Sequence, residues 1–168
     1  MPWSNPENQR WVLNKVATLQ PKTVLDIGAG SGTYAKLLRP YIDARFVAIE
    51  IFEPYIDTYK LNELYDEVWR EDVRKYTSLQ ADLIIFGDVL EHMTREEAVK
   101  VWNVARAGCS SAIISVPIVH YPQGEWFDNP YEVHVVDDWD NIKIWQTFEG
   151  LTECIVGKQT GTYLGVFK

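Results

Sequence analysis

The chain has 168 residues, of which 46% are hydrophobic and 13% aromatic, and this composition suits one folded domain. Its formal net charge of -8 argues against nucleic acid or an anionic membrane surface as a partner. The first ten residues lack the apolar centre of a signal peptide, and no apolar run is long enough to cross a bilayer. Cys109 and Cys154 fall in expected buried strands, which favours reduced cysteines. We therefore expect a cytoplasmic protein, whose oligomeric state the composition leaves open.

Apolar runs and amphipathic segments alternate along the chain. The pattern predicts helices over about 6–19, 31–41, 54–64, 94–108 and 137–148, the first capped by Asn5 or Ser4 and the last by Asp137 or Asp138. It predicts strands over about 23–27, 45–49, 67–70, 81–86, 112–116, 151–156 and 162–167. Strands that alternate with helices and then end in a hairpin predict a single-domain α/β fold. We expect a seven-stranded, mostly parallel sheet with a C-terminal antiparallel hairpin and helices on both faces.

Two helices carry specific signals. In the helix over 94–108, Thr94 and Glu97 have the spacing of a capping box. In the helix over 31–41, an apolar stripe is formed by Tyr34, Leu37, Leu38 and Tyr41. The long segment over 117–136 is rich in proline and aromatic residues, so we expect an ordered functional loop there.

The stretch 24–34, V-L-D-I-G-A-G-S-G-T-Y, is the most informative in the chain. An apolar strand is followed by three glycines at alternate positions and then by a helix, which predicts a ligand corner of an open sheet. A dinucleotide fingerprint has the spacing G-x-G-x-x-G, whereas this stretch has G-x-G-x-G. Asp26 precedes the glycines and would repel a pyrophosphate, so a cationic ligand fits better.

Four expected strand ends carry acids. Asp26, Glu50, Asp72 and Asp88 each fall where a parallel strand reaches its carboxyl edge, which is where open sheets bind ligands. Glu50 follows the glycine turn by about twenty residues, at the place of an acid that binds ribose hydroxyls. A single acid would be read as a solvated loop residue, but four at successive strand ends indicate a site.

The motifs D-I-G-A-G-S-G at 26–32 and G-D-V-L-E-H at 87–92 resemble those of the class I S-adenosylmethionine-dependent methyltransferases. The resemblance covers about residues 23–168 and implies a Rossmann-like domain, residues 1–168. The N-terminal helix would occupy 1–20 and the seven-stranded core 21–168, with a lid loop at 117–136. It implies S-adenosylmethionine as cofactor and a small-molecule acceptor. DNA methyltransferases of this class carry an N-P-P-Y type motif, whereas Asn129-Pro130-Tyr131 lies after the fifth strand and is interpreted as a turn.

The resemblance also implies roles for individual residues. Asp26 and the turn Gly28, Ala29, Gly30 and Gly32 would hold the methionine part of the cofactor, and Glu50 the ribose. The adenine would meet Ile51, Asp72 and Val73, and the sulfonium end Asp88 and Val89. For a hydroxyl acceptor a general base helps, and the candidates are His92, then His134, then Glu132 and His120. Each histidine could instead simply bond to the backbone.

The loop at 117–136 falls where this fold places a substrate lid. Its aromatic residues Tyr121, Trp126, Phe127 and Tyr131 could stack on an acceptor, or could only cover the cofactor. His120, Asp128, Glu132 and His134 could be metal ligands, but they lack tight ligand spacing, so no metal is predicted.

The main hypothesis is methyl transfer to a small molecule, with oxygen slightly favoured over nitrogen as the acceptor atom. The alternative is a non-catalytic S-adenosylmethionine-binding module or partner subunit. A nicotinamide-dependent dehydrogenase is disfavoured by the glycine spacing and by Asp26.

Overall fold

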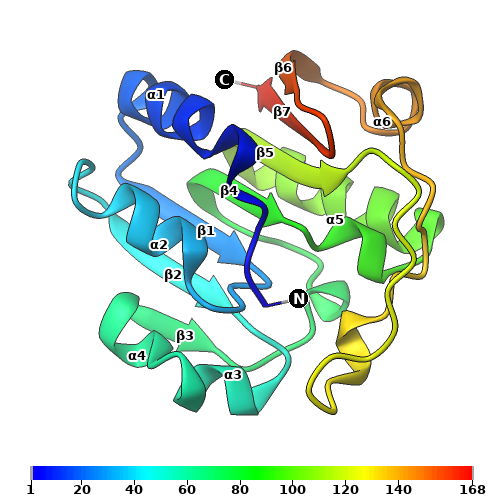
Figure 1. The fold of residues 1–168 in the computed structure, drawn as a ribbon. Coiled ribbons are helices and arrows are strands. Elements are labelled where there is room, and N and C mark those ends of the chain that lie inside the picture. The colour runs from blue at the N-terminus through cyan, green and yellow to red at the C-terminus, as the bar shows by residue number, and fades with distance from the viewer. Residues whose placement is uncertain (1, 168) are drawn as a thin grey trace.

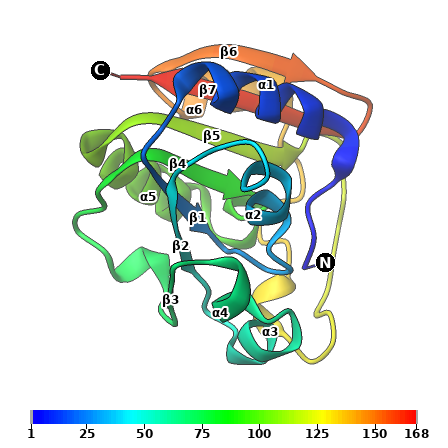
Figure 2. The same ribbon diagram turned by 90° about the vertical axis from the view of Figure 1, so that its left-hand side faces the viewer.

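The structure is a computed structural model that describes residues 2–167. Its seven-stranded sheet has the order β3-β2-β1-β4-β5-β7-β6. The strands are β1 (Thr23–Ile27), β2 (Arg45–Ile49), β3 (Glu67–Trp69), β4 (Ala81–Gly87), β5 (Cys109–Pro117), β6 (Leu151–Val156) and β7 (Thr160–Val166). The pairs among β1 to β5 are parallel, and β7 runs antiparallel between β5 and β6. Figure 2 shows the strands stepping from β3 at the bottom to the β6–β7 hairpin at the top. The predicted fold is confirmed.

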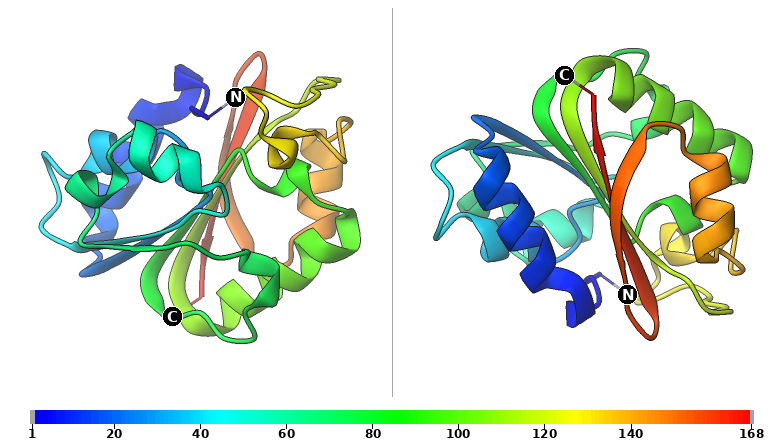
Figure 3. Two further views of the ribbon diagram at one scale, coloured as in Figure 1. Left: turned by 90° about the horizontal axis from the view of Figure 1, so that it is seen from below. Right: turned by 90° about the horizontal axis from the view of Figure 1, so that it is seen from above.

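Helices cover both faces of the twisted sheet (Figures 1 and 3). The helices are α1 (Gln9–Leu19), α2 (Thr33–Leu38), α3 (Glu53–Thr58), α4 (Leu61–Leu64), α5 (Arg95–Gly108) and α6 (Asn141–Thr147). Short 3₁₀ turns lie at Pro6–Asn8, Val73–Lys75, Leu90–His92 and Pro130–Glu132. On one face, α1 and α2 bury side chains such as Val16 and Leu38. On the other, α5 and the end of α6 bury Trp102 and Phe148, whose rings meet edge to face.

Several local predictions are confirmed. Asn5 accepts a hydrogen bond from the Glu7 amide and caps the first 3₁₀ turn. The capping box of α5 is present, with both the Thr94 and the Glu97 side chains bonded to backbone amides. The strands 45–49 and 151–156 have the predicted bounds. The sequence predicted these caps and strands because their patterns extend over only a few neighbouring residues.

Four expectations need correction. The helix over 54–64 is two helices, because Lys60 takes a left-handed conformation with φ of 51°. The helix over 31–41 ends at Leu38, ahead of Pro40, which has no amide hydrogen to donate; Tyr41 is exposed and Ile42 takes the buried place. The last helix begins at Asn141 and is capped by Asp140, not by Asp137 or Asp138. Cys154 is exposed, because β6 is the edge strand of the sheet.

Strand bounds also shift slightly. β5 begins at Cys109, directly after α5, and therefore extends three residues before the predicted start. β7 begins at Thr160, two residues early. Among the residues that the structure describes, no helix combines the length and apolar character needed to cross a membrane.

Substitution of Gly108 tests the close approach of the end of α5 to the backbone at Leu79. A Cβ atom at this position would lie 1.6 Å from the Leu79 carbonyl oxygen. We expect Gly108→Ala to lower the free energy of unfolding by about 1–3 kcal/mol in urea titration, as overpacking does. Gly124→Ala is the matched control, since a Cβ there meets nothing within 4 Å. Equal stability of the two variants would contradict the predicted contact.

Candidate functional site

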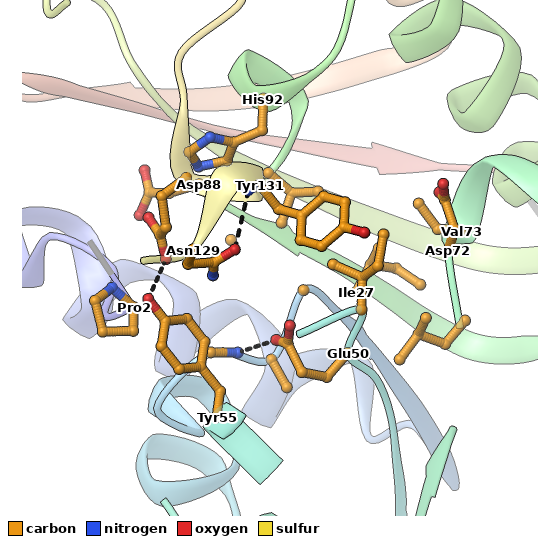
Figure 4. A pocket seen from close by; sticks show the side chains of 18 of the residues that line it. Pro2, Ile27, Glu50, Tyr55, Asp72, Val73, Asp88, His92, Asn129 and Tyr131 are labelled. Atoms are coloured by element: carbon orange, nitrogen blue, oxygen red, sulfur yellow. Dashed lines mark hydrogen bonds between the residues drawn. The ribbon is translucent and has the colours of Figure 1, made fainter. Parts of the chain in front are cut away.

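The carboxyl ends of β1, β2 and β4 surround a pocket with about 850 Å³ of open space, called here the first pocket. It is lined by the turn after β1, the start of the loops after β2, β3 and β4, residues 2–4, and part of the loop at 117–136 (Figure 4). Of the predicted cofactor residues, those that line it are Gly28, Ala29, Gly30, Glu50, Ile51, Asp72, Val73, Asp88 and Val89.

The turn after β1 requires glycine for conformational and steric reasons. Gly28 and Gly30 have φ of +65° and +52°, in the left-handed region that favours glycine. A Cβ atom at Gly28 would lie 2.5 Å from Val89, and one at Gly30 would lie 2.3 Å from the Pro2 carbonyl oxygen. The backbone can therefore pass close to the β4 loop and to the N-terminal segment.

Glu50 connects the ends of β1 and β2. Its carboxylate accepts hydrogen bonds from the Gly30 amide at 2.8 Å and from the Phe52 amide at 2.8 Å. The side chain is only 5% exposed, and burial raises its pKa. Figure 4 shows it directed toward the glycine turn at the wall of the first pocket.

Asp26 and Gly32 lie behind the first pocket and do not line it. The Asp26 carboxylate is buried and accepts a hydrogen bond from the Tyr65 hydroxyl. Burial raises the pKa of Asp26 to about 7, and this effect exceeds the opposing one of the Tyr65 hydrogen bond. A Cβ atom at Gly32 would face Leu64 and Leu61. Both residues therefore lie beneath the glycine turn and support it, and their predicted contact with the cofactor stays a prediction.

Asp72 is held in place by its neighbour Arg74. Its carboxylate accepts from the Arg74 amide at 2.9 Å and from the Arg74 side chain, and it caps the 3₁₀ turn Val73–Lys75. Arg74 also reaches Glu97 at the start of α5. Asp72 and Val73 are therefore fixed at the wall of the first pocket, on the side away from Asp88 (Figure 4).

Asp88 lies at the opposite side of the pocket in a left-handed conformation, with φ of 55°. Such strain in a residue other than glycine concentrates at functional sites. Its amide donates to the Ser115 carbonyl oxygen at 2.8 Å, while its Oδ2 is buried without a hydrogen-bond partner among the described residues. Burial raises the pKa of Asp88 to about 6.

A second pocket, with about 550 Å³ of open space, adjoins the first. Trp3, Asp88 and His92 line both pockets and form their common wall. The second pocket is further lined by Glu91, Tyr121, Gln123 and His134. The two candidate catalytic histidines therefore meet at this pocket, and their rings pack edge to face with centroids 4.9 Å apart.

Both histidines are anchored by the backbone. Nδ1 of His92 lies 3.1 Å from the Val133 carbonyl oxygen, and Nδ1 of His134 lies 2.6 Å from the Tyr121 carbonyl oxygen. Burial lowers the pKa of His92 to about 4 and also lowers the pKa of His134. The low pKa of His92 makes its ring a weak proton acceptor, and the role of general base stays a prediction for both histidines.

The four aromatic residues of the expected lid separate in the structure. Tyr131 lines the first pocket and Tyr121 lines the second. The rings of Trp126 and Phe127 pack edge to face against each other, and neither residue lines either pocket. Phe127 is 71% exposed. Asn129 accepts from the Tyr131 amide, so the interpretation of Asn129-Pro130-Tyr131 as a turn is confirmed.

Some lining residues were not predicted from the sequence. Pro2, Trp3 and Ser4 pass over the glycine turn, where the Ser31 amide donates to the Pro2 carbonyl oxygen at 2.6 Å. Tyr55 donates to Glu132 at 2.9 Å across the first pocket (Figure 4). No local pattern marks these residues, because chain segments far apart in sequence bring them together. Glu91 belongs to the noted G-D-V-L-E-H motif, but was given no role.

Comparison with known proteins places this chain in a family. The methyltransferase domain family matches residues 7–98, which is more than half of the chain, and the chain belongs to this family. Its fold and motifs are those of the class I, Rossmann-like S-adenosylmethionine-dependent methyltransferases. No curated protein sequence matches the chain.

Solved structures share the fold at low sequence identity. A methyltransferase from Clostridium acetobutylicum, described as S-adenosylmethionine-dependent, is 11% identical with a TM-score of 0.70, over 95% of this chain and 90% of that one. The N-terminal domain of EvdMO1, crystallised with S-adenosylhomocysteine and D-fucose, is 12% identical with a TM-score of 0.68, over 98% and 84%. Human N-acetylserotonin methyltransferase in complex with S-adenosylmethionine is 15% identical with a TM-score of 0.67, over 95% and 51%. The chain thus spans about half the length of the human enzyme, and 55% of a similar Nostoc punctiforme chain.

Asp26 should leave a signature in the pH dependence of stability. A carboxyl group whose folded pKa of about 7 exceeds the unfolded value of about 3.9 contributes stability below the unfolded pKa. That contribution is lost as pH rises through about 7. Asp26→Asn does not titrate, so its unfolding free energy relative to wild type should increase from about pH 4 to pH 7 and then level off.

The measurement is urea unfolding of both proteins at several pH values. Asp43→Asn, at an exposed position, is the control for the loss of a carboxylate elsewhere on the chain. A pH-independent difference for Asp26→Asn would show that the Asp26 carboxyl group is not perturbed by burial.

Proposed function

We propose that this chain transfers the methyl group of S-adenosylmethionine to a small-molecule acceptor, with an oxygen nucleophile favoured over nitrogen. The observation that carries the proposal is the pair of adjoining pockets with a common wall of Trp3, Asp88 and His92. Methyl transfer requires two ligands whose reacting atoms meet across a short gap. Family membership indicates the reaction class, and the residues common to both pockets mark where the cofactor and the acceptor would meet.

The first pocket fits the parts of the cofactor. Asp88 offers a buried carboxylate oxygen that lacks a partner among the described residues, which suits the positive charge of the ligand. We assign the ribose to Glu50 and the adenine to Ile51, Asp72 and Val73, and the lining of the first pocket by all four residues supports this assignment. When bound, S-adenosylmethionine supplies an activated methyl group on a sulfonium, so the protein mainly has to position the acceptor and exclude water.

The second pocket suits a small acceptor. It is lined by aromatic and polar side chains, among them Trp3, Tyr121 and Gln123, which can contact both apolar and polar parts of a small ligand. The net charge of -8 disfavours nucleic acid and anionic membrane surfaces, so a small molecule remains the expected partner. Because a carbonyl oxygen only accepts, each anchored histidine carries its proton on Nδ1 and keeps a free Nε2 lone pair. That lone pair can accept a hydrogen bond from an acceptor hydroxyl and so orient its oxygen.

Calorimetric titration tests the cofactor assignment. We expect S-adenosylmethionine and S-adenosylhomocysteine to bind with a stoichiometry of one, and NAD not to bind. An acceptor screen would then follow methyl transfer to small hydroxyl and amine compounds. Binding of NAD alone would overturn the proposal. Cofactor binding without turnover on any hydroxyl or amine acceptor would favour a non-catalytic binding module.

Glu50→Ala tests the ribose side of the first pocket. The substitution removes a pocket carboxylate and its hydrogen bond to the Gly30 amide, so we expect S-adenosylmethionine to bind about tenfold more weakly or worse. The control is Glu53→Ala, because Glu53 is exposed, pairs with Arg70 and lies outside the pocket. Unchanged affinity in Glu50→Ala would remove Glu50 from the binding site.

A further inference from the structure

Glu91, His92 and His134 form a compact group of potential metal ligands. Their ligand atoms all lie within 4.8 Å of one another, at the wall of the second pocket. Ligands bound at about 2.0–2.2 Å from one ion lie about 3–4 Å apart, so the three groups need to approach by only about 1 Å. This group differs from His120, Asp128, Glu132 and His134, which the sequence analysis considered and set aside when it predicted no metal, and only His134 is common to both.

Glu91 is the unexplained member of the group. Its side chain is 1% exposed, and both carboxylate oxygens lack a hydrogen-bond partner among the described residues. A buried charged group without partners is costly, so buried carboxylates are normally paired or bind metal ions. The unpartnered carboxyl group therefore leaves both oxygens available to a positively charged ligand.

Backbone contacts hold the three residues of the group together. The Glu91 carbonyl oxygen accepts from the amides of Val135 and Val136 at 2.8 and 3.0 Å. On the other side of His134, the Val133 carbonyl oxygen lies 3.1 Å from Nδ1 of His92. These contacts flank His134 and hold its loop against the 3₁₀ turn Leu90–His92, although 41 residues separate His92 from Val133.

The two imidazoles are presented as metal ligands usually are. Nδ1 of each ring faces a backbone carbonyl oxygen, which can only accept a hydrogen bond. Each Nδ1 therefore carries the proton, and each Nε2 keeps its lone pair for a ligand. Such a hydrogen bond from the second ring nitrogen fixes the tautomer and orientation of metal-bound histidines.

We propose that Glu91, His92 and His134 bind one divalent transition-metal ion at the wall of the second pocket. Two imidazoles and one carboxylate suit Zn²⁺, Fe²⁺ or Co²⁺ better than Mg²⁺ or Ca²⁺, which prefer oxygen ligands alone. Three protein ligands leave coordination positions open for a small molecule in the pocket.

The role of the metal rests on the proposed methyl transfer. An acceptor hydroxyl bound at the open positions would have its pKa lowered, as metal-bound water does. The acceptor oxygen then gives a lone pair to the methyl carbon, the carbon–sulfur bond breaks with its electron pair going to sulfur, and the hydroxyl proton passes to water. An acceptor with two neighbouring oxygens, such as a vicinal diol or a hydroxy ketone, could occupy both open positions.

Metal titration of the chelator-treated, untagged protein tests the site. All proteins carry Cys154→Ser, because the exposed Cys154 thiol could bind the probe metals. Zn²⁺ and Co²⁺ should each bind with a stoichiometry of one and raise the unfolding temperature. We expect Glu91→Gln and His134→Ala to weaken metal binding by about tenfold or more, since even indirect ligand partners have effects of that size.

His120→Ala is the matched control, because His120 is 72% exposed and lies outside the group. It should bind metal as the parent does. Absence of Zn²⁺ and Co²⁺ binding in the parent, or equal binding in the parent and Glu91→Gln, would overturn the site. Glu91→Gln retains the shape of the side chain and the backbone contacts of residue 91, and its urea unfolding transition checks that it folds.

S-adenosylmethionine titration of the same proteins separates the two proposals. Cofactor binding without metal binding would refute the metal site alone. Metal binding that depends on Glu91, without cofactor binding, would leave the metal site standing and refute the proposed function.

Discussion

The hydrogen bond from the Gly30 amide to the Glu50 carboxylate is the contact on which the site depends. It joins the turn after β1 to the end of β2, two neighbouring parallel strands whose carboxyl ends form the floor of the first pocket. The turn can bring its amide to Glu50 because positive φ angles at Gly28 and Gly30 fold the backbone back on itself. The carboxyl ends of the parallel strands form the edge of the pocket, and this bond holds the glycine turn in position at that edge.

Around this contact the protein concentrates acids in a desolvated region. Burial raises the pKa of Asp26, Glu50, Asp88 and Glu91, so ionising them in the folded state costs free energy. A cluster of buried carboxyl groups of this kind adds little to the free energy of folding. It is typical of sites that bind cationic ligands. Carboxylates at exposed positions behave differently: Glu7 accepts three backbone amide hydrogen bonds, which lower its pKa and stabilise the start of β7.

The sequence was informative wherever the signal is local. A short apolar run defined β2, Thr94 and Glu97 defined the start of α5, and the glycine spacing located the ligand edge. It failed where distant contacts decide: Asp138 pairs with Arg95 and Lys143, which leaves the cap of α6 to Asp140. The hydrogen bond from the Tyr65 hydroxyl to Asp26 joins residues 39 positions apart and has no local signature, while the role of Asp26 in holding the cofactor stays a prediction. The meeting of Glu91 with His134 likewise has no local signature.

The common wall of the two pockets has a thermodynamic consequence. Trp3, Asp88 and His92 face both cavities, so a ligand in one changes the groups available to the other. Binding free energies in such an arrangement are coupled, and the coupling is reciprocal. Whatever factor the first ligand imposes on the affinity of the second, the second imposes on the first. A preference for one order of addition would therefore be kinetic in origin, since at equilibrium the two routes to the ternary complex have the same free energy.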